Sequence, residues 1–270
     1  MGETNHHTNG TDTTSLNRQT LHDKIAIVSG SCSGIGAGIA RELSSRGAHV
    51  VINYPYSHLL HVANKVLHSL ATPGIGVEAD LSTVDGPGKL IDETIQAYGR
   101  IDILVNNAGL AVNLPFAQQT HEHWDRLVNL NGRGTFFLTQ AALPHLPKNG
   151  GGRIVNVVST SARDPPVGQS IYAGTKGMID SLTKCWAKEL PGRYGCTVNA
   201  VSPGATRTEG FADAGPEAMI HLQPHIDATP VAPRLGEVDE VAFAVGFLCE
   251  ERARWVNGTH LFVTGGLTIG

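Results

Sequence analysis

The sequence lacks the features of a membrane-spanning or nucleic-acid-binding protein. Its apolar runs stay well below the roughly 18 residues that a membrane span needs. Its net charge of −4 comes without the basic stripe that nucleic acid would require. We therefore expect neither a membrane nor nucleic acid as a partner.

Cysteine is scarce as well. The histidines have no Cys or carboxylate neighbours at ligand spacing, so no metal site is expected. The four cysteines lie far apart and match no metal-binding pattern. We expect reduced, mostly buried thiols in a cytoplasmic protein at Cys32, Cys185, Cys196 and Cys249.

The N-terminal segment has no apolar core. Residues 1–20 are largely polar, which argues against a signal peptide. His6 stands where a myristoylation signal needs Ser or Thr. We expect a disordered polar tail over residues 1–20 and one domain over residues 21–270.

Glycine, by contrast, is plentiful, and the 32 glycines favour a fold with many tight turns. Apolar strands alternate with amphipathic helices along the chain. This pattern predicts an α/β protein with a Rossmann-type, doubly wound, seven-stranded parallel sheet in a single domain. Strands are expected at 24–30, 48–54, 74–80, 101–107, 152–159, 196–202 and 259–265, and helices at 34–47, 57–70, 86–98, 120–145, 172–190 and 237–251.

The first expected strand runs directly into the glycine-rich segment SGSCSGIG (29–36). Gly30 permits a tight turn, and Gly34 and Gly36 remove side chains where the backbone would approach a pyrophosphate. The following helix offers N–H groups and a partial positive charge to phosphates. A tight turn without a ligand could use the same glycines, but the place between strand and helix favours dinucleotide binding.

The glycine spacing is GxxxGxG, which resembles the short-chain dehydrogenase/reductase family. Asp80-Leu81, NNAG (106–109) and SPGATRT (202–208) follow in the family's order. The resemblance covers roughly residues 22–266 and implies a nicotinamide cofactor and a homodimer or homotetramer. The cofactor-binding residues that it implies are Gly30, Ser33, Gly34, Ile35, Gly36, Asn53, Tyr54, Ser57, Asp80, Leu81, Asn107, Ala108, Gly109, Tyr172, Lys176, Pro203, Gly204, Thr206 and Thr208.

The end of the second strand bears on the choice between NADH and NADPH. Members of the family that prefer NAD carry an Asp there, which would repel a 2′-phosphate. This chain has Asn53, Tyr54 and Ser57 instead, an arrangement similar to that of the fungal NADPH-dependent naphthol reductases and ketoreductases. Although Ser33 stands where many NADP-dependent members carry Arg, we expect NADP(H) as the cofactor.

Tyr172 and Lys176 are four residues apart and share one face of the expected helix. Many amphipathic helices contain such a pair. Here, however, Ser159 ends the preceding strand, and Asn131 lies in the segment NGRGTFF. The four residues match the catalytic Asn, Ser, Tyr and Lys of the family.

These residue types suit hydride transfer to a carbonyl, whose oxygen needs a proton donor as negative charge develops. The resemblance makes Tyr172 that general acid, with its pKa lowered by the Lys176 ammonium. Ser159 would hold the substrate oxygen, and Asn131 would order a water. The sequence thus predicts an NADPH-dependent reductase of secondary metabolism. A non-catalytic dinucleotide sensor is the rival class. Such proteins often lose the Tyr or the Lys, whereas this chain keeps both.

Two further segments bear on the substrate. The stretch ARDPPVG (162–168) is either a rigid, solvated loop or a pocket rim where Asp164, paired with Arg133, binds a cationic nitrogen. A similar Asp-Pro-Pro segment occurs in fungal iminium reductases of alkaloid biosynthesis, some of which guide a cyclisation. Residues 209–233 are expected to form a largely apolar lid, which favours a bulky substrate.

Overall fold

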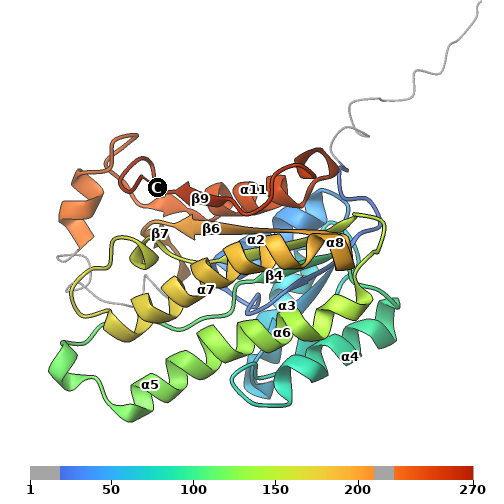
Figure 1. The fold of residues 1–270 in the computed structure, drawn as a ribbon, viewed down its shortest axis with the longest axis horizontal. Helices are drawn as coiled ribbons and strands as arrows, with labels where there is room; N and C mark the ends of the chain where they lie inside the picture. The colour runs from blue at the N-terminus through green and yellow to red at the C-terminus, as the bar shows by residue number, and fades with distance from the viewer. Residues whose placement is uncertain (1–18, 210–221, 270) are drawn as a thin grey trace, which may run out of the picture.

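The computed structural model describes residues 19–209 and 222–269. Most of the expected tail and positions 210–221 of the expected lid lie outside these ranges. Within the described residues, seven parallel strands form one sheet in the order β3-β2-β1-β4-β5-β6-β9 (Figure 1). The strands are β1 (Ile25–Val28), β2 (His49–Tyr54), β3 (Ile75–Glu78), β4 (Ile103–Asn106), β5 (Gly152–Val157), β6 (Cys196–Pro203) and β9 (His260–Val263); β7 (Thr206–Arg207) pairs separately with β8 (Gly236–Glu237).

This strand order confirms the expected doubly wound fold. The chain moves from β1 outward to β3, then crosses back and continues from β4 on the other side of β1. At such a reversal the connecting loops diverge and leave a crevice at the carboxyl ends of the strands. The glycine-rich segment follows β1 and the NNAG segment follows β4, so both border this crevice.

Helices cover both faces of the sheet. On β1, Ala26 and Val28 pack into one core cluster and Ile27 into the other, because successive strand side chains point to opposite faces. Helices α2, α3 and α11 complete the first cluster, and α4, α6 and α7 complete the second (Figure 1). The helices are α2 (Gly34–Ser45), α3 (Leu60–His68), α4 (Gly86–Tyr98), α5 (His121–Leu127), α6 (Thr135–Ala142), α7 (Ser170–Glu189), α8 (Pro191–Tyr194) and α11 (Val238–Cys249).

The helix expected over 120–145 is not uniformly α-helical. Helix α5 passes through the π-helical segment η3 (Val128–Gly134) before α6 begins. Gly134 lies so close to the loop after β3 that an added Cβ would sit 2.5 Å from the Leu81 carbonyl oxygen. A π turn holds an extra residue, so it changes which side chains face inward. Here Asn131 is buried at 2% exposure.

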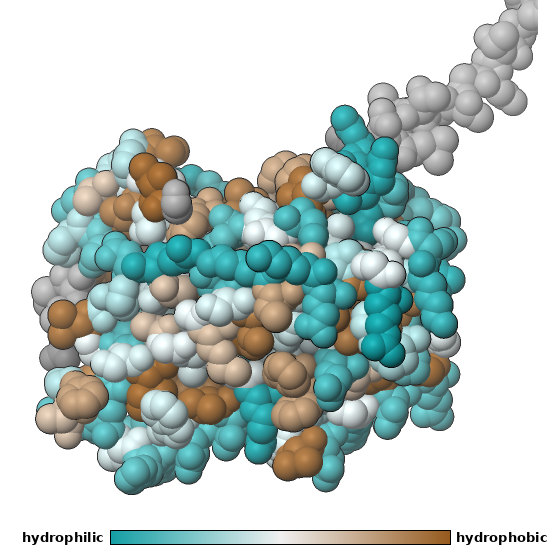
Figure 2. Space-filling view, viewed as in Figure 1, coloured by the Kyte–Doolittle hydropathy of each residue, from teal (hydrophilic) through white to brown (hydrophobic). Residues whose placement is uncertain are grey.

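The surface formed by α5, α6 and α7 carries large apolar side chains. Trp124, Phe137 and Met178 are 56%, 46% and 43% exposed. Figure 2 shows brown and tan patches over these helices, between hydrophilic areas. Among the described residues, no helix is long and apolar enough to cross a membrane.

Candidate active site

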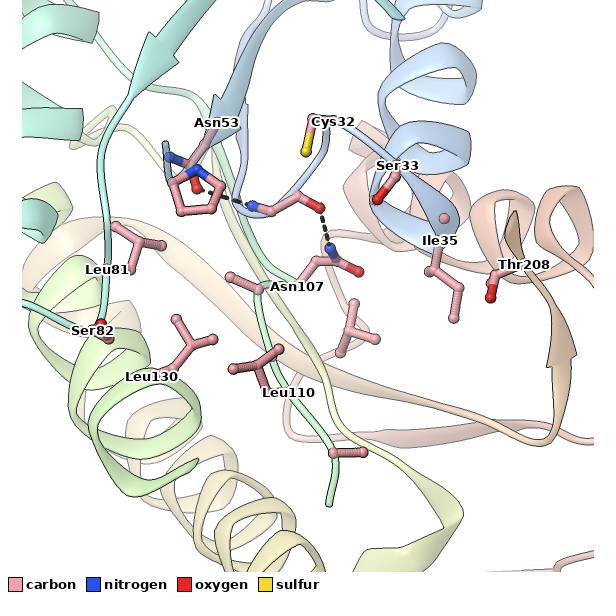
Figure 3. A pocket seen from close by; sticks show the side chains of 18 of the residues that line it. Cys32, Ser33, Ile35, Asn53, Leu81, Ser82, Asn107, Leu110, Leu130 and Thr208 are labelled. Carbon is pink, nitrogen blue, oxygen red and sulfur yellow. Dashed lines mark hydrogen bonds between the residues drawn. The ribbon is translucent and has the colours of Figure 1, made fainter. Parts of the chain in front are cut away.

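The turn after β1 packs directly on the turn after β4. Gly30 adopts a φ of 59°, and an added Cβ there would lie 2.9 Å from the Ala108 Cα. At Gly36 an added Cβ would lie 2.5 Å from both the Asn107 Nδ2 and the Gly30 carbonyl oxygen. The Asn107 side chain donates to the Ser29 carbonyl at 2.9 Å and to the Gly30 carbonyl at 3.1 Å (Figure 3). Any side chain at position 30 or 36 would therefore force the two turns apart.

A cleft of about 680 Å³ runs from this turn to Tyr172. The first N–H groups of α2 border it, and such groups have no partner inside their helix. The Ser33 side chain does not cap them. The cleft thus offers an anion-binding end, as a dinucleotide requires. Of the residues implied by the resemblance, it is lined by Gly30, Ser33, Gly34, Ile35, Gly36, Asn53, Asp80, Leu81, Asn107, Ala108, Gly109, Ser159, Tyr172, Lys176, Pro203, Gly204 and Thr208.

At the end of β2 the structure differs from the expectation. Asn53 bridges the turns, accepting from the Gly30 N–H at 3.0 Å and donating to the Ala79 carbonyl at 2.9 Å. Tyr54 is only 6% exposed and packs in the core, while Ser57 is exposed and is not among the lining residues. Tyr56, which is half exposed and stacks on His58, lines the cleft in their place.

The sequence reasoning also missed other lining residues. Thr206 was expected in the cleft but is not among its lining residues, whereas Cys32, Pro55, Ser82 and Arg126 are. Pro55, Tyr56 and Ser82 lie within two residues of expected positions, so sequence proximity was the available signal. Arg126 lies on α5, and nothing in its local sequence indicated this placement.

Asn131 joins the loop after β4 to helix α7. Its amide donates to the Leu110 carbonyl and accepts from the Leu110 N–H, both at 2.9 Å. It also donates to the Thr175 hydroxyl at 3.0 Å. An added Cβ at Gly109 would lie 3.3 Å from the Asn131 Oδ1 and 3.5 Å from the Lys176 Nζ. The Asn131 and Lys176 side chains therefore both pack close to this glycine.

Ser159, Tyr172 and Lys176 converge at the inner end of the cleft. The Ser159 side chain lies near enough to Tyr172 to lower its pKa, and the Ser159 Oγ accepts from the Ser161 N–H at 3.1 Å. The Lys176 Nζ donates to the Val157 carbonyl at 2.8 Å and lies 5.8 Å from the centre of the Tyr172 ring. Three of the four expected catalytic residues thus line one pocket, with Asn131 behind them.

The electrostatics of this group differ from the expectation. Burial raises the pKa of Tyr172 above its ordinary value, and the hydrogen bond from Ser159 only partly opposes the effect. Burial also lowers the pKa of Lys176 from 10.5 to about 8. The net shift of the Tyr172 pKa is therefore upward and not downward as expected, because desolvation outweighs the hydrogen bond from Ser159.

Arg133 and Asp164 are not brought together. The Arg133 guanidinium donates to the Ser82 carbonyl, which ties η3 to the loop after β3. Asp164 is exposed, its N–H donates to the Thr160 carbonyl at 2.9 Å, and it is not part of the cleft lining. The expected pairing is therefore corrected. The neighbouring Arg163 instead forms an ion pair with Asp180 at 2.9 Å.

The described residues contain no group of three His, Cys, Asp or Glu side chains that could hold a metal ion. Their cysteines are all free; Cys185 is exposed, and Cys32, Cys196 and Cys249 are buried.

Comparisons with known proteins agree with the geometry of the cleft. Residues 30–268 match the family model described as enoyl-(acyl carrier protein) reductase. The short-chain dehydrogenase/reductase FrzI of Cladobotryum sp is 41% identical, over 92% of this chain and 96% of the relative. Hydroxynaphthalene reductase of Aspergillus fumigatus is 33% identical, over 88% and 90% of the two chains.

A solved structure shows the same fold. The structure is that of a short chain dehydrogenase from Burkholderia cenocepacia in complex with NADP. It is 34% identical and superposes with a TM-score of 0.83, over 92% of this chain and 99% of that one. The chain therefore belongs to the short-chain dehydrogenase/reductase family of oxidoreductases.

Proposed function

We propose that this protein is an NADP(H)-dependent reductase that delivers a hydride to the carbonyl group of a bulky small molecule, with Tyr172 as the general acid. One observation carries the proposal. A single cleft has a glycine turn and a helix N-terminus at one end and Ser159, Tyr172 and Lys176 at the other.

The residues present fit the cofactor. The backbone of the glycine turn and the N-terminus of α2 would hold the diphosphate, and Pro203, Gly204 and Thr208 would border the nicotinamide. No Asp or Glu stands at the end of β2, where Asn53, Pro55 and Tyr56 line the cleft. A 2′-phosphate would therefore meet no electrostatic repulsion there. The solved relative in complex with NADP supports the same choice. When bound, the cofactor supplies the hydride.

The protein's own groups handle the proton. The raised pKa keeps the Tyr172 hydroxyl protonated at neutral pH, so that it can donate to the substrate oxygen. The Ser159 hydroxyl lines the same pocket as Tyr172 and would supply a second donor to the substrate oxygen. Lys176, with a pKa of about 8, can release or accept a proton near neutrality. Asn131, across Gly109, would hold a water that connects Lys176 to solvent.

The fungal relatives support a substrate from secondary metabolism. We test this by following NADPH oxidation at 340 nm against two panels: aromatic polyketide-type ketones and quinones, and cyclic iminium compounds. NADH is run in parallel. Turnover of the first panel with NADPH supports the proposal. Turnover of only the second would favour the iminium reductase alternative. NADPH binding without turnover in either panel would favour a dinucleotide sensor.

We also propose that the protein assembles as a homodimer or homotetramer through the α5–α7 surface. The support is the set of exposed side chains of Trp124, Phe137 and Met178 on adjacent helices. Exposed apolar patches of this kind mark contact surfaces. Light scattering after size exclusion gives the mass directly, and a monomer at micromolar concentration would contradict the proposal.

A further inference from the structure

A buried carboxylate lies one helical turn beyond Lys176. Asp180, on α7, has a side chain that is 7% exposed. Its Oδ2 accepts from the Arg163 guanidinium and from the Lys184 Nζ, both at 2.9 Å, and its Oδ1 accepts from the His260 Nδ1 at 2.8 Å. Buried charges in proteins are usually paired, and two of these three partners, Arg163 and His260, come from segments outside α7.

The contacts continue through His260, on the edge strand β9. Its ring stacks on Phe262 with centroids 4.4 Å apart, and its Nε2 is hydrogen-bonded to the Ser202 hydroxyl. Burial lowers the pKa of His260 against the opposing influence of Asp180, and Arg163 and Lys184 lower it further. The neutral ring thus donates a hydrogen bond from its Nδ1–H to Asp180 and accepts one from the Ser202 hydroxyl at Nε2.

The order Ser202, His260, Asp180 is that of a nucleophile triad. However, Ser202 is 0% exposed, enclosed at the end of β6, so no substrate can reach it. A reactive role is therefore excluded, and the arrangement must act through the segments that it joins.

The segments that these contacts join all lead to residues that line the cleft. Arg163 follows Ser159 by four residues, Asp180 follows Lys176 by four, and Ser202 immediately precedes Pro203 and Gly204, which line the cleft. One carboxylate thus connects the segment of the Ser159 hydroxyl, the helix of the Tyr172–Lys176 pair and the turn that would border the nicotinamide.

We infer that Asp180 is a positioning residue, which holds the Ser159 segment and the Pro203–Gly204 turn in alignment with Tyr172 and Lys176. The inference rests on the proposed reductase function. Small displacements of reacting groups lower rates by up to about 100-fold. Loss of the carboxylate should therefore lower kcat more than it raises KM for the carbonyl substrate.

The test compares Asp180→Ala with Asp180→Asn and with a matched control, Thr183→Val. Thr183 is buried on the same helix and bonds Asn156 and the Ile179 carbonyl, away from the cleft. We expect kcat to fall about 10- to 100-fold in Asp180→Ala, with a weaker NADPH affinity measured by fluorescence titration without turnover. Asp180→Asn keeps an acceptor for His260 and should recover part of kcat. Thr183→Val should lose stability but keep kcat per folded molecule.

The Arg163 link supplies a second, independent measurement if Asp180→Ala does not fold. Arg163 is 43% exposed, so Arg163→Ala should fold and show a kcat loss that Arg163→Lys partly restores. Wild-type kcat in Asp180→Asn and Arg163→Ala, or the same loss in Thr183→Val, would overturn the inference. Absence of wild-type turnover in both panels would instead overturn the proposed function.

Discussion

Lys176 carries a buried charge whose removal should stabilise the fold while it disables the site. Lys176 is 6% exposed, and its Nζ donates to the Val157 carbonyl at 2.8 Å. Methionine has a similar length and no charge. The perturbation is therefore Lys176→Met, and the quantity of interest is the free energy of unfolding.

The size of the effect follows from the pKa of Lys176, which burial lowers from 10.5 to about 8. At about 1.4 kcal/mol per unit, holding this charge in the folded state at pH 7 costs about 3 kcal/mol. The lost hydrogen bond to Val157 offsets about 1 kcal/mol. We expect Lys176→Met to unfold with a free energy about 2 kcal/mol higher than the wild type at pH 7.

The downward direction of the Lys176 pKa shift also determines how the free energy of unfolding depends on pH. Above about pH 8 the folded protein releases the Lys176 proton, whereas the unfolded chain keeps it up to its ordinary pKa. The unfolded state then binds more protons, so wild-type stability rises with pH. Between pH 7 and pH 9 this contribution amounts to about 1 kcal/mol, and Lys176→Met should lack it.

Urea unfolding followed by tryptophan fluorescence, at one protein concentration and three pH values, measures both quantities. Lys188→Met is the control, because Lys188 is exposed on the same helix. It should match the wild type in stability and in pH slope. If Lys176→Met is less stable than the wild type at pH 7 and keeps the same slope, the reasoning from burial is refuted.

Three further outcomes follow from the geometry. Gly36→Ala places a Cβ 2.5 Å from the Asn107 amide and the Gly30 carbonyl; it should destabilise the fold by about 1–3 kcal/mol and weaken NADPH binding in a titration. Ser33→Arg adds a cation at the exposed mouth of the glycine turn; it should tighten NADPH binding by about tenfold and leave NADH binding unchanged, and equal effects on both would show that no 2′-phosphate is contacted. Trp124→Glu would bury a charge in the proposed assembly contact, so light scattering should report a lower mass for the particle. An unchanged mass would place the contact elsewhere.

Much of the site followed from local patterns in the sequence. The strand order and the loops that border the cleft depend on hydrophobic periodicity and on motifs placed directly after strands, which are properties of short segments. Ser159, Tyr172 and Lys176 line one pocket, and each is tied to the end of β5 or to one face of α7.

The features that the sequence did not predict are those that depend on contacts between residues far apart in the chain. Tyr54 and Tyr56 are two residues apart, and only the packing against α3 and β3 determines that the first is buried and the second lines the cleft. The π-helical segment that contains Asn131 ends at Gly134, which packs closely on the loop after β3. The contact of Asp180 with His260 joins residues 80 positions apart, and no local pattern predicts it.

The most direct test of the central claim is NADPH oxidation at 340 nm by the wild type and by Tyr172→Phe, on the best carbonyl substrate of the panel. The account predicts wild-type turnover, a loss of at least about 100-fold in kcat for Tyr172→Phe, and similar NADPH affinities in a fluorescence titration. A Tyr172→Phe variant that keeps the wild-type kcat would contradict the assignment of Tyr172 as the proton donor.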